Sequence, residues 1–155
     1  MQLQRGWLLH ENAREFLPRV RPAFLALQCG MGHWALARRA LAEVQAHLHG
    51  RASFLDEARQ VLSERLENTV NELKQGLLDG RFQQQPAALF KLRITLAESA
   101  ADAVQLELQA SGGKAYLSEY GEGFARRWRE SAFVPIVTPS LVQLRAELQR
   151  QAGAA

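Results

Sequence analysis

The sequence contains a single cysteine, Cys29, so no disulfide bond can form within the chain. Its four histidines fall in no spacing that metal ligands use, and the sequence therefore predicts no metal site. A run of about 18 apolar residues is also lacking, and residues 1–15 do not contain the apolar stretch of a signal peptide. These absences favour a cytoplasmic protein that has no membrane partner.

Lysine is scarce as well, with 3 lysines against 16 arginines, and the net charge is only +3. Like charges do not gather in long blocks, so nucleic acid is not expected as a partner. Short arginine clusters either meet phosphates or form solvated helix faces, and charge runs more often do the latter. The clusters are Arg19 with Arg21, Arg38 with Arg39, and Arg126, Arg127 with Arg129.

β-Branched residues are sparse, whereas Leu, Ala, Gln, Glu and Arg dominate. Unbranched side chains lose little rotamer freedom in a helix, so this composition predicts an all-α fold. A length of 155 residues with 47% hydrophobic content is enough for one domain with its own core. We expect a lead-in segment over residues 1–20, a helical domain over 21–150 and a tail over 151–155.

Apolar residues recur every three or four positions in three long segments, which predicts helices over about 22–49, 53–79 and 86–110. Gly50, Gly80 and the Gly112-Gly113 pair are expected to end them, and Pro86 suits a first helical position. A shorter amphipathic helix follows, with aromatic residues spaced for packing, and then an extended stretch over 133–137. Thr138 and Pro139 are expected to cap a last helix. The segments together predict an antiparallel four-helix bundle.

Several short motifs follow one another along the chain, namely Arg51 with Phe54, the segment from Gln109 to Tyr116, Glu119-Tyr120 and Arg129-Glu130. Their order resembles the C-terminal helical domain of acyl-CoA dehydrogenases. Arg51 and Phe54 resemble the family's R-x-x-F-G motif, although Leu55 replaces its glycine. The segment from Gln109 to Tyr116 resembles the turn Q-x-x-G-G-x-G-Y, with alanine at the third glycine. Glu119-Tyr120 and Arg129-Glu130 then resemble the family's E-Y and R-D pairs. The resemblance covers residues 20–150.

The resemblance implies contacts to FAD, commonly the FAD of a neighbouring subunit. It implies that the cofactor-binding residues are Arg51, Phe54, Gln109, Gly112, Gly113 and Ser140. A glycine turn lets the backbone approach a diphosphate closely, because no Cβ stands in the way. The family reading also predicts that the Gly112 turn and the Thr138 region project from one end of the bundle.

The family's catalytic glutamate is missing from its expected position. Residues 135–140 fall on the family's P-I-Y-E-G-T segment, and Thr138 stands where the glutamate would abstract a proton, which a threonine cannot do. Some members keep the glutamate on an earlier helix, a position that falls near Val20 or Leu25 here. Neither is a carboxylate, and Glu15 is the acidic residue nearby. No catalytic residue is therefore predicted.

Three functions remain open at this stage. The first is an FAD-contacting or oligomerisation module without dehydrogenase activity of its own, which binds FAD only together with a partner or with the family's other domains. The second is the C-terminal part of an FAD-dependent acyl-CoA or acyl-carrier dehydrogenase, active with a partner chain. The third is an unrelated helical adaptor. The first two imply a homo-oligomer or a larger acyl-CoA dehydrogenase-like partner.

Overall fold

The computed structural model describes residues 4–48 and 53–153, which are helical almost throughout and contain no β-strand. The all-α prediction is confirmed. In chain order the elements are η1 (Arg5–Trp7), α1 (Ala13–Leu27), the π-helix η2 (Gln28–Trp34), α2 (Ala35–Leu48), α3 (Ser53–Leu78), α4 (Arg81–Gln84), α5 (Pro86–Ser111), η3 (Gly112–Tyr116), α6 (Ser118–Phe133), η4 (Val134–Ile136) and α7 (Leu141–Gly153).

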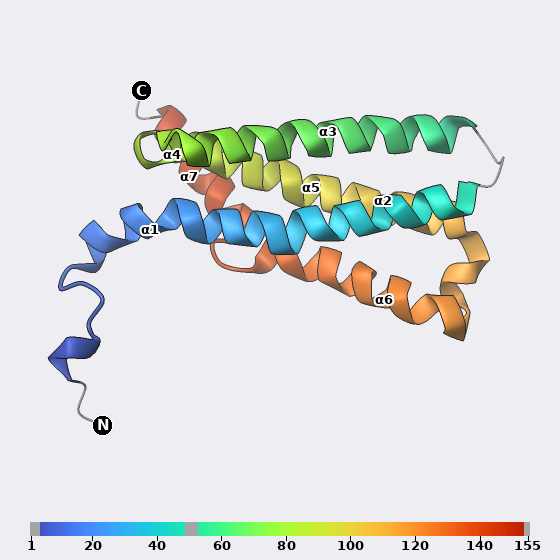
Figure 1. Ribbon diagram of the computed structural model, residues 1–155, viewed down its shortest axis with the longest axis horizontal. Coiled ribbons are helices and arrows are strands. Elements are labelled where there is room, and N and C mark those ends of the chain that lie inside the picture. The colour runs from blue at the N-terminus through green and yellow to red at the C-terminus, as the bar shows by residue number, and fades with distance from the viewer. Residues whose placement is uncertain (1–3, 49–52, 154–155) are drawn as a thin grey trace.

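The elements α1, η2 and α2 form one continuous rod, and the long helices that follow it alternate in direction (Figure 1). The central helix is α5, which packs against α2, α3, α6 and α7. The core is apolar and lies mainly between α2, α3 and α5, where Val44, Leu66, Leu89, Leu96 and Val104 are buried. The predicted apolar stripes thus face this core, because each helix turns its three-and-four-spaced side inward.

The first long helix begins at Ala13, upstream of the start that the sequence predicted at Pro22. Asn12 caps it, since its side-chain oxygen accepts a hydrogen bond from the Arg14 backbone N–H at 3.0 Å. Pro18 and Pro22 consequently lie inside α1. Each proline leaves the carbonyl four residues earlier without its usual donor, but Arg14 and Pro18 are exposed and their carbonyls can be hydrated.

Two predicted helix ends are confirmed by the backbone. Gly80 follows α3 with a φ of 72°, and Gly112 follows α5 with a φ of 55°. Residues that have a Cβ rarely adopt these backbone angles. Pro86 is the first residue of α5, a position where its missing N–H costs no hydrogen bond within the helix. Gly50 lies outside the described residues.

The prediction for the last helix is wrong in its cap. Residues 134–136 form a 3-10 turn instead of an extended stretch, and α7 begins at Leu141, after Thr138 and Pro139. The cap is Ser140: its Oγ accepts a hydrogen bond from Gln143 N at 3.3 Å, and its own N–H donates to Gln143 Oε1 at 2.7 Å. This reciprocal capping box satisfies two backbone donors, which a threonine two residues earlier cannot reach.

Candidate functional site

Four of the predicted cofactor-binding residues lie at chain positions that face solvent. Phe54 is in the first turn of α3 and is 66% exposed, Gln109 is exposed in the last turn of α5, and Gly112 and Gly113 begin η3. Arg51 lies outside the described residues. These four residues therefore lie on accessible surface and not in the core.

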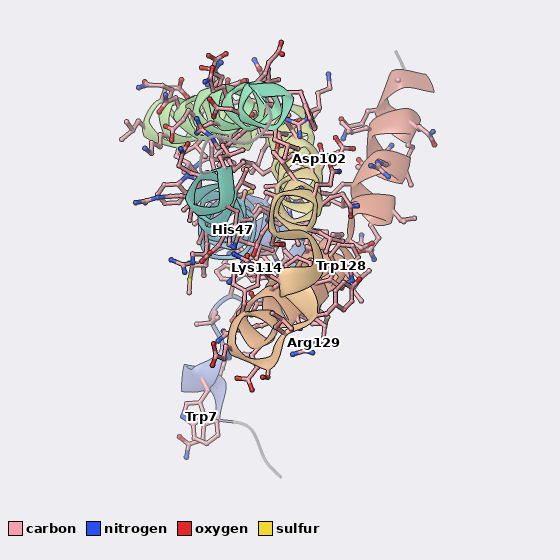
Figure 2. The ribbon with its side chains drawn as sticks, turned by 90° about the vertical axis from the view of Figure 1, so that its right-hand side faces the viewer. Trp7, His47, Asp102, Lys114, Trp128 and Arg129 are labelled. Carbon is pink, nitrogen blue, oxygen red and sulfur yellow. The ribbon has the colours of Figure 1, made fainter. Side chains whose placement is uncertain are left out.

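These four residues lie toward the same end of the molecule. An ion pair between Arg65 Nη2 and Asp102 Oδ2 at 2.5 Å, beside a hydrogen bond from Arg65 Nε to Ser99 Oγ at 3.0 Å, fixes the register of α3 against α5. Because the two helices run in opposite directions, this register sets the start of α3 beside the last turns of α5 (Figure 1). Figure 2 looks onto this end, where Lys114 is labelled.

The Gly112 turn leaves its backbone open to approach. A Cβ built on Gly112 or Gly113 meets no atom within 4 Å, so the space beside both residues is unfilled. Only Gly112 needs glycine for its φ; the backbone of Gly113 suits any residue. Glycine at position 113 therefore leaves open space beside the backbone, although the backbone conformation does not require glycine there. Lys114, exposed beside the pair, adds a positive charge.

Thr138 and Ser140 do not join this group. They follow α6, whereas the Gly112 turn precedes it, so the two segments lie at opposite ends of a helix of 16 residues. The expectation that both project from one end is wrong. Ser140 has its own function as the cap of α7, and the structure does not bring it near the other predicted contacts.

The segment around Thr138 is anchored through its carbonyl groups. Arg93, fully buried on α5, donates from Nη2 to Val137 O at 3.0 Å and from Nη1 to Pro139 O. Gln28 of the π-helix donates from Nε2 to Thr138 O at 3.0 Å. Three consecutive carbonyls are thus held by two side chains, which gives the segment a structural function: it ties α7 to α5 and to the π-helix.

The positions at which the resemblance places a catalytic glutamate carry no carboxylate. Leu25 is buried and Val20 half-buried, both apolar. Glu15 accepts a hydrogen bond from Asn12 Nδ2 at 2.7 Å in the first turn of α1, about 20 Å along the helix from Gln28. Glu147 lines a small pocket beside Pro139, but hydrogen bonds from Arg150 and Gln151 lower its pKa to about 2, which makes it a weak base.

The sequence interpretation missed the buried polar residues, which are Arg93, His33 and Glu107 among others. Burial lowers the pKa of His33 to about 4 and raises the pKa of the nearby Cys29 thiol to about 12. At neutral pH this pair is an uncharged imidazole and an uncharged thiol, and it lacks the thiolate that nucleophilic catalysis needs. The missed signal was a polar residue inside an apolar stripe, as at Arg93 between Leu92 and Ile94.

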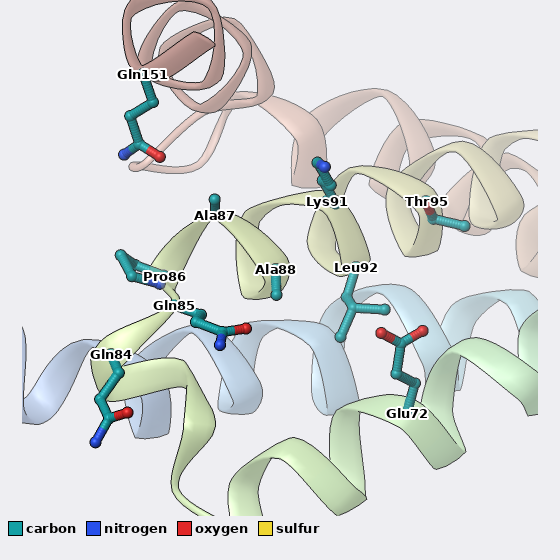
Figure 3. A pocket seen from close by; sticks show the side chains of 10 residues that line it. All are labelled: Glu72, Gln84, Gln85, Pro86, Ala87, Ala88, Lys91, Leu92, Thr95 and Gln151. Carbon is teal, nitrogen blue, oxygen red and sulfur yellow. The ribbon is translucent and has the colours of Figure 1, made fainter. Parts of the chain in front are cut away.

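A pocket of about 710 Å³ opens where the α4 region meets α3, α5 and α7 (Figure 3). Its polar lining consists of the amides of Gln84, Gln85 and Gln151 together with the side chains of Glu72, Lys91 and Thr95. None of the predicted contact residues lines it. These side chains can donate and accept hydrogen bonds to a bound molecule.

Over residues 4–48 and 53–153, no cluster of three metal-ligating side chains occurs. In the same ranges no helix has the length and apolar content needed to cross a bilayer. Comparison with known proteins adds no relative, since no family model, curated protein or solved structure matches this chain.

Proposed function

We propose that this chain is a non-catalytic helical module, similar to the C-terminal domain of acyl-CoA dehydrogenases, that supplies one wall of an FAD site. The rest of that site belongs to a larger acyl-CoA dehydrogenase-like partner or to further domains. The observation that carries the proposal is that Phe54 lies at the same exposed end of the molecule as Gln109, Gly112 and Gly113, although α3 is far from these residues in sequence.

The chemistry of this end suits a dinucleotide phosphate. The unfilled glycine turn leaves room for phosphate oxygens to approach the backbone at Gly113, whereas the Gly112 N–H already donates to Leu108 O. The Gln109 amide can donate to the same oxygens. Lys114 contributes charge, and the exposed ring of Phe54 offers an apolar surface for the rest of the ligand. One open wall buries little of a ligand, so we expect weak binding by this chain alone.

The absence of independent dehydrogenase activity rests on the Thr138 segment. Its carbonyls are engaged by Arg93 and Gln28, and Thr138 itself cannot accept a proton. We therefore assign this segment to anchoring α7. In this proposal the rod of α1 and α2 forms an antiparallel four-helix arrangement with α3, α5 and α6, which differs from the family expectation in placing the Thr138 segment at the end opposite the Gly112 turn.

The proposal is tested by titrating the ¹⁵N-labelled chain with FAD and, separately, with ADP, and following backbone amide chemical shifts. We expect saturable shifts for residues 109–114 and for Phe54, at ligand concentrations in the high micromolar to millimolar range. Shifts that appear elsewhere, or none up to several millimolar ligand, would contradict the proposal.

A matched pair of variants sharpens this titration. Gly113→Val fits the backbone but places a branched side chain where the phosphate would approach, so the shifts should disappear. Gly153→Val serves as the control, because Gly153 also has open space beside it and lies in the last turn of α7. Equal binding by the two variants would refute the role of the glycine turn.

A further inference from the structure

Two of the arginine clusters noted in the sequence meet at one groove. Arg39 of α2 lines it together with Arg126 and Arg127 of α6, although the two helices are far apart in sequence. The groove has a volume of about 520 Å³ and lies between α6 and the rod formed by the π-helix and α2. Arg38 and Arg129, which belong to the same clusters, are exposed outside it. The fold therefore brings guanidinium groups from two distant helices to a shared surface.

The groove also has an apolar part. Met31, Leu36 and Val134 contribute its large apolar side chains. Gly32 from the π-helix and Gly123 from α6 contribute no side chain, so they leave the groove wide. A volume of several hundred Å³ is typical of pockets that bind small molecules. The groove thus combines charged groups with apolar surface, and this combination suits an amphipathic ligand.

The charged groups of the groove offer more hydrogen-bond donors than acceptors. Each guanidinium carries five N–H donors and no acceptor. Within the part of the chain that the structure describes, Arg39 donates to Glu43 through Nη2. Arg126 donates to Glu130 through Nε at 2.7 Å, and Glu130 is the one carboxylate among the described residues that line the groove. N–H groups of these two arginines therefore remain for a ligand that accepts hydrogen bonds.

Arg127 is the fixed member of the three arginines. Its Nε and Nη2 donate to the buried carboxylate of Glu107 at 2.8 and 2.5 Å, so the guanidinium is held in place. The remaining nitrogen, Nη1, lies 3.3 Å from the position that a Cβ on Gly123 would occupy. Because residue 123 is a glycine, no side chain covers Nη1 from this position. A donor that is already held in place reduces the entropy cost of binding.

We propose that this groove binds a small amphipathic monocarboxylate, which consists of one carboxylate attached to an apolar chain. The carboxylate accepts hydrogen bonds from the three guanidinium groups, and the apolar chain lies against the large apolar side chains of the groove. Arginine suits a carboxylate because its planar N–H groups can form two parallel hydrogen bonds to the two oxygens.

The surrounding charges favour a ligand with one negative charge over a ligand with two. The three guanidinium groups have carboxylate partners, which are Glu43, Glu107 and Glu130. Glu130 can be exchanged, because its side chain is 42% exposed, whereas Glu107 is fully buried. A ligand carboxylate that replaces Glu130 at Arg126 keeps the same balance of charge. A phosphate monoester carries about −1.5 to −2 at neutral pH, and its additional charge would lack a counter-charge.

Titration of the ¹⁵N-labelled full chain with hexanoate tests the proposal. We expect saturable shifts of the backbone amides of residues 32–39 and 123–134 at millimolar ligand. 1-Hexanol has the apolar chain without the charge, and inorganic phosphate has charge without the chain, so both should shift these amides far less at the same concentration. The proposal fails if hexanoate produces no saturable shifts up to several millimolar, or if 1-hexanol or phosphate binds equally well.

The length of the ligand tests the apolar part of the groove. Each buried CH₂ group should strengthen binding by up to about fourfold, so hexanoate should bind much more tightly than acetate. Equal affinity for acetate and hexanoate would show that the apolar side chains contribute nothing, which contradicts an amphipathic ligand.

Matched variants separate the groove from a general effect of charge. Arg39→Gln and Arg126→Gln should each weaken hexanoate binding about tenfold, because a hydrogen bond between charged groups is lost. Arg38→Gln and Arg129→Gln are the controls: they remove the same charge from the same helices but lie outside the groove. All four side chains are exposed, so the fold should tolerate each change. Equal weakening by a variant and its control would refute the site.

Glu130→Gln should have the opposite effect. It removes the carboxylate that competes with the ligand for Arg126, so hexanoate should bind about two- to fivefold more tightly. A folding defect cannot produce tighter binding. Glu122→Gln is the control, because Glu122 is exposed on the same helix and outside the groove, and hexanoate binding should not change. Unchanged or weaker binding by Glu130→Gln would overturn the exchange of carboxylates.

The residues of this groove are different from those of the proposed FAD contact. Gly113→Val should leave hexanoate binding unchanged, and Arg126→Gln should leave the FAD-induced shifts of residues 109–114 unchanged. The failure of one proposal is thereby distinguishable from the failure of the other.

Discussion

Arg127 of α6 grips both carboxylate oxygens of Glu107 on α5, with Nε at 2.8 Å from Oε2 and Nη2 at 2.5 Å from Oε1. Glu107 is fully buried, and Tyr120 donates its hydroxyl to the same carboxylate at 2.8 Å. Two residues of α6 thus converge on one acidic side chain of the central helix. This contact determines how α6 is seated beside the core.

Removing Glu107 should strongly destabilise the fold. Glu107→Ala leaves the Arg127 guanidinium half-buried without its partner, and we expect the free energy of unfolding to fall by about 3–5 kcal/mol. Urea denaturation followed by circular dichroism measures the change. The paired replacement of Glu107 by Leu and Arg127 by Met should recover most of the loss, because no buried charge then remains unpaired.

The exposed ion pair on the same helix is the control for this experiment. Arg126 and Glu130 are 2.7 Å apart, but their side chains are 76% and 42% exposed. Glu130→Ala should cost less than about 1 kcal/mol, since solvent screens such pairs. Equal effects of Glu107→Ala and Glu130→Ala would show that the burial of the first pair contributes nothing.

Arg93 is expected to hold α7 in place. Arg93→Met removes the donors to Val137 O and Pro139 O, so the segment before α7 loses its attachment to α5. Hydrogen–deuterium exchange should show protection of residues 141–153 falling at least about tenfold while the protection of α5 persists. Arg145→Met breaks the exposed pair of Arg145 with Glu98 instead and should leave the protection of α7 almost unchanged. Uniform loss of protection in Arg93→Met would mean that Arg93 supports the whole fold.

Gly76 is expected to resist replacement by alanine although it lies within α3. A Cβ at Gly76 would collide with the ring of Phe82, which is buried. Alanine normally favours a helix by about 1 kcal/mol over glycine, but overpacking against an aromatic ring costs about 1–3 kcal/mol, so we expect net destabilisation by Gly76→Ala in urea denaturation. Gly30→Ala is the control, because its Cβ meets no atom within 4 Å. Adding Phe82→Leu should relieve the Gly76→Ala defect.

The parts of the fold that the sequence predicted are those determined by local chemistry. Gly80, Gly112 and Pro86 act through their own backbone preferences, so the helix ends they mark could be found without tertiary information. The apolar stripes of the long helices are likewise local, and they predicted which sides face the core. The predicted start of α1 was wrong because Pro18 and Pro22 were expected near the first turn of the helix, whereas the helix begins at Ala13, after its cap Asn12.

The parts that could not be predicted depend on residues distant in sequence. Arg93 can be buried because backbone carbonyls more than 40 residues away accept hydrogen bonds from its guanidinium. Glu107 can be buried because Arg127, on the next long helix, donates hydrogen bonds to its carboxylate. At the candidate site, the motif resemblance selected Phe54 and the Gly112 turn, but only the register of α3 against α5 brings them to one end.

The last expectation concerns acid stability. His33 is fully buried, its Nδ1 donates to Gln28 O at 3.1 Å, and burial lowers its pKa from 6.5 to about 4. In the unfolded chain the same imidazole binds a proton near pH 6.5, so between pH 6.5 and pH 4 the unfolded state holds more protons than the folded state. The contribution of His33 to the free energy of unfolding should therefore fall as the pH drops through this window, by up to about 3 kcal/mol, and should be constant above pH 6.5.

Urea denaturation at a series of pH values measures this slope. His33→Gln cannot take up a proton, so its free energy of unfolding should change less between pH 6.5 and pH 4 than that of the unmodified chain. The difference between the two curves isolates His33 from the carboxylates that titrate at lower pH. His10→Gln, in the segment before α1 and outside the core, should retain the full slope; if it flattens the curve as much as His33→Gln does, the buried imidazole is not the source of the acid sensitivity.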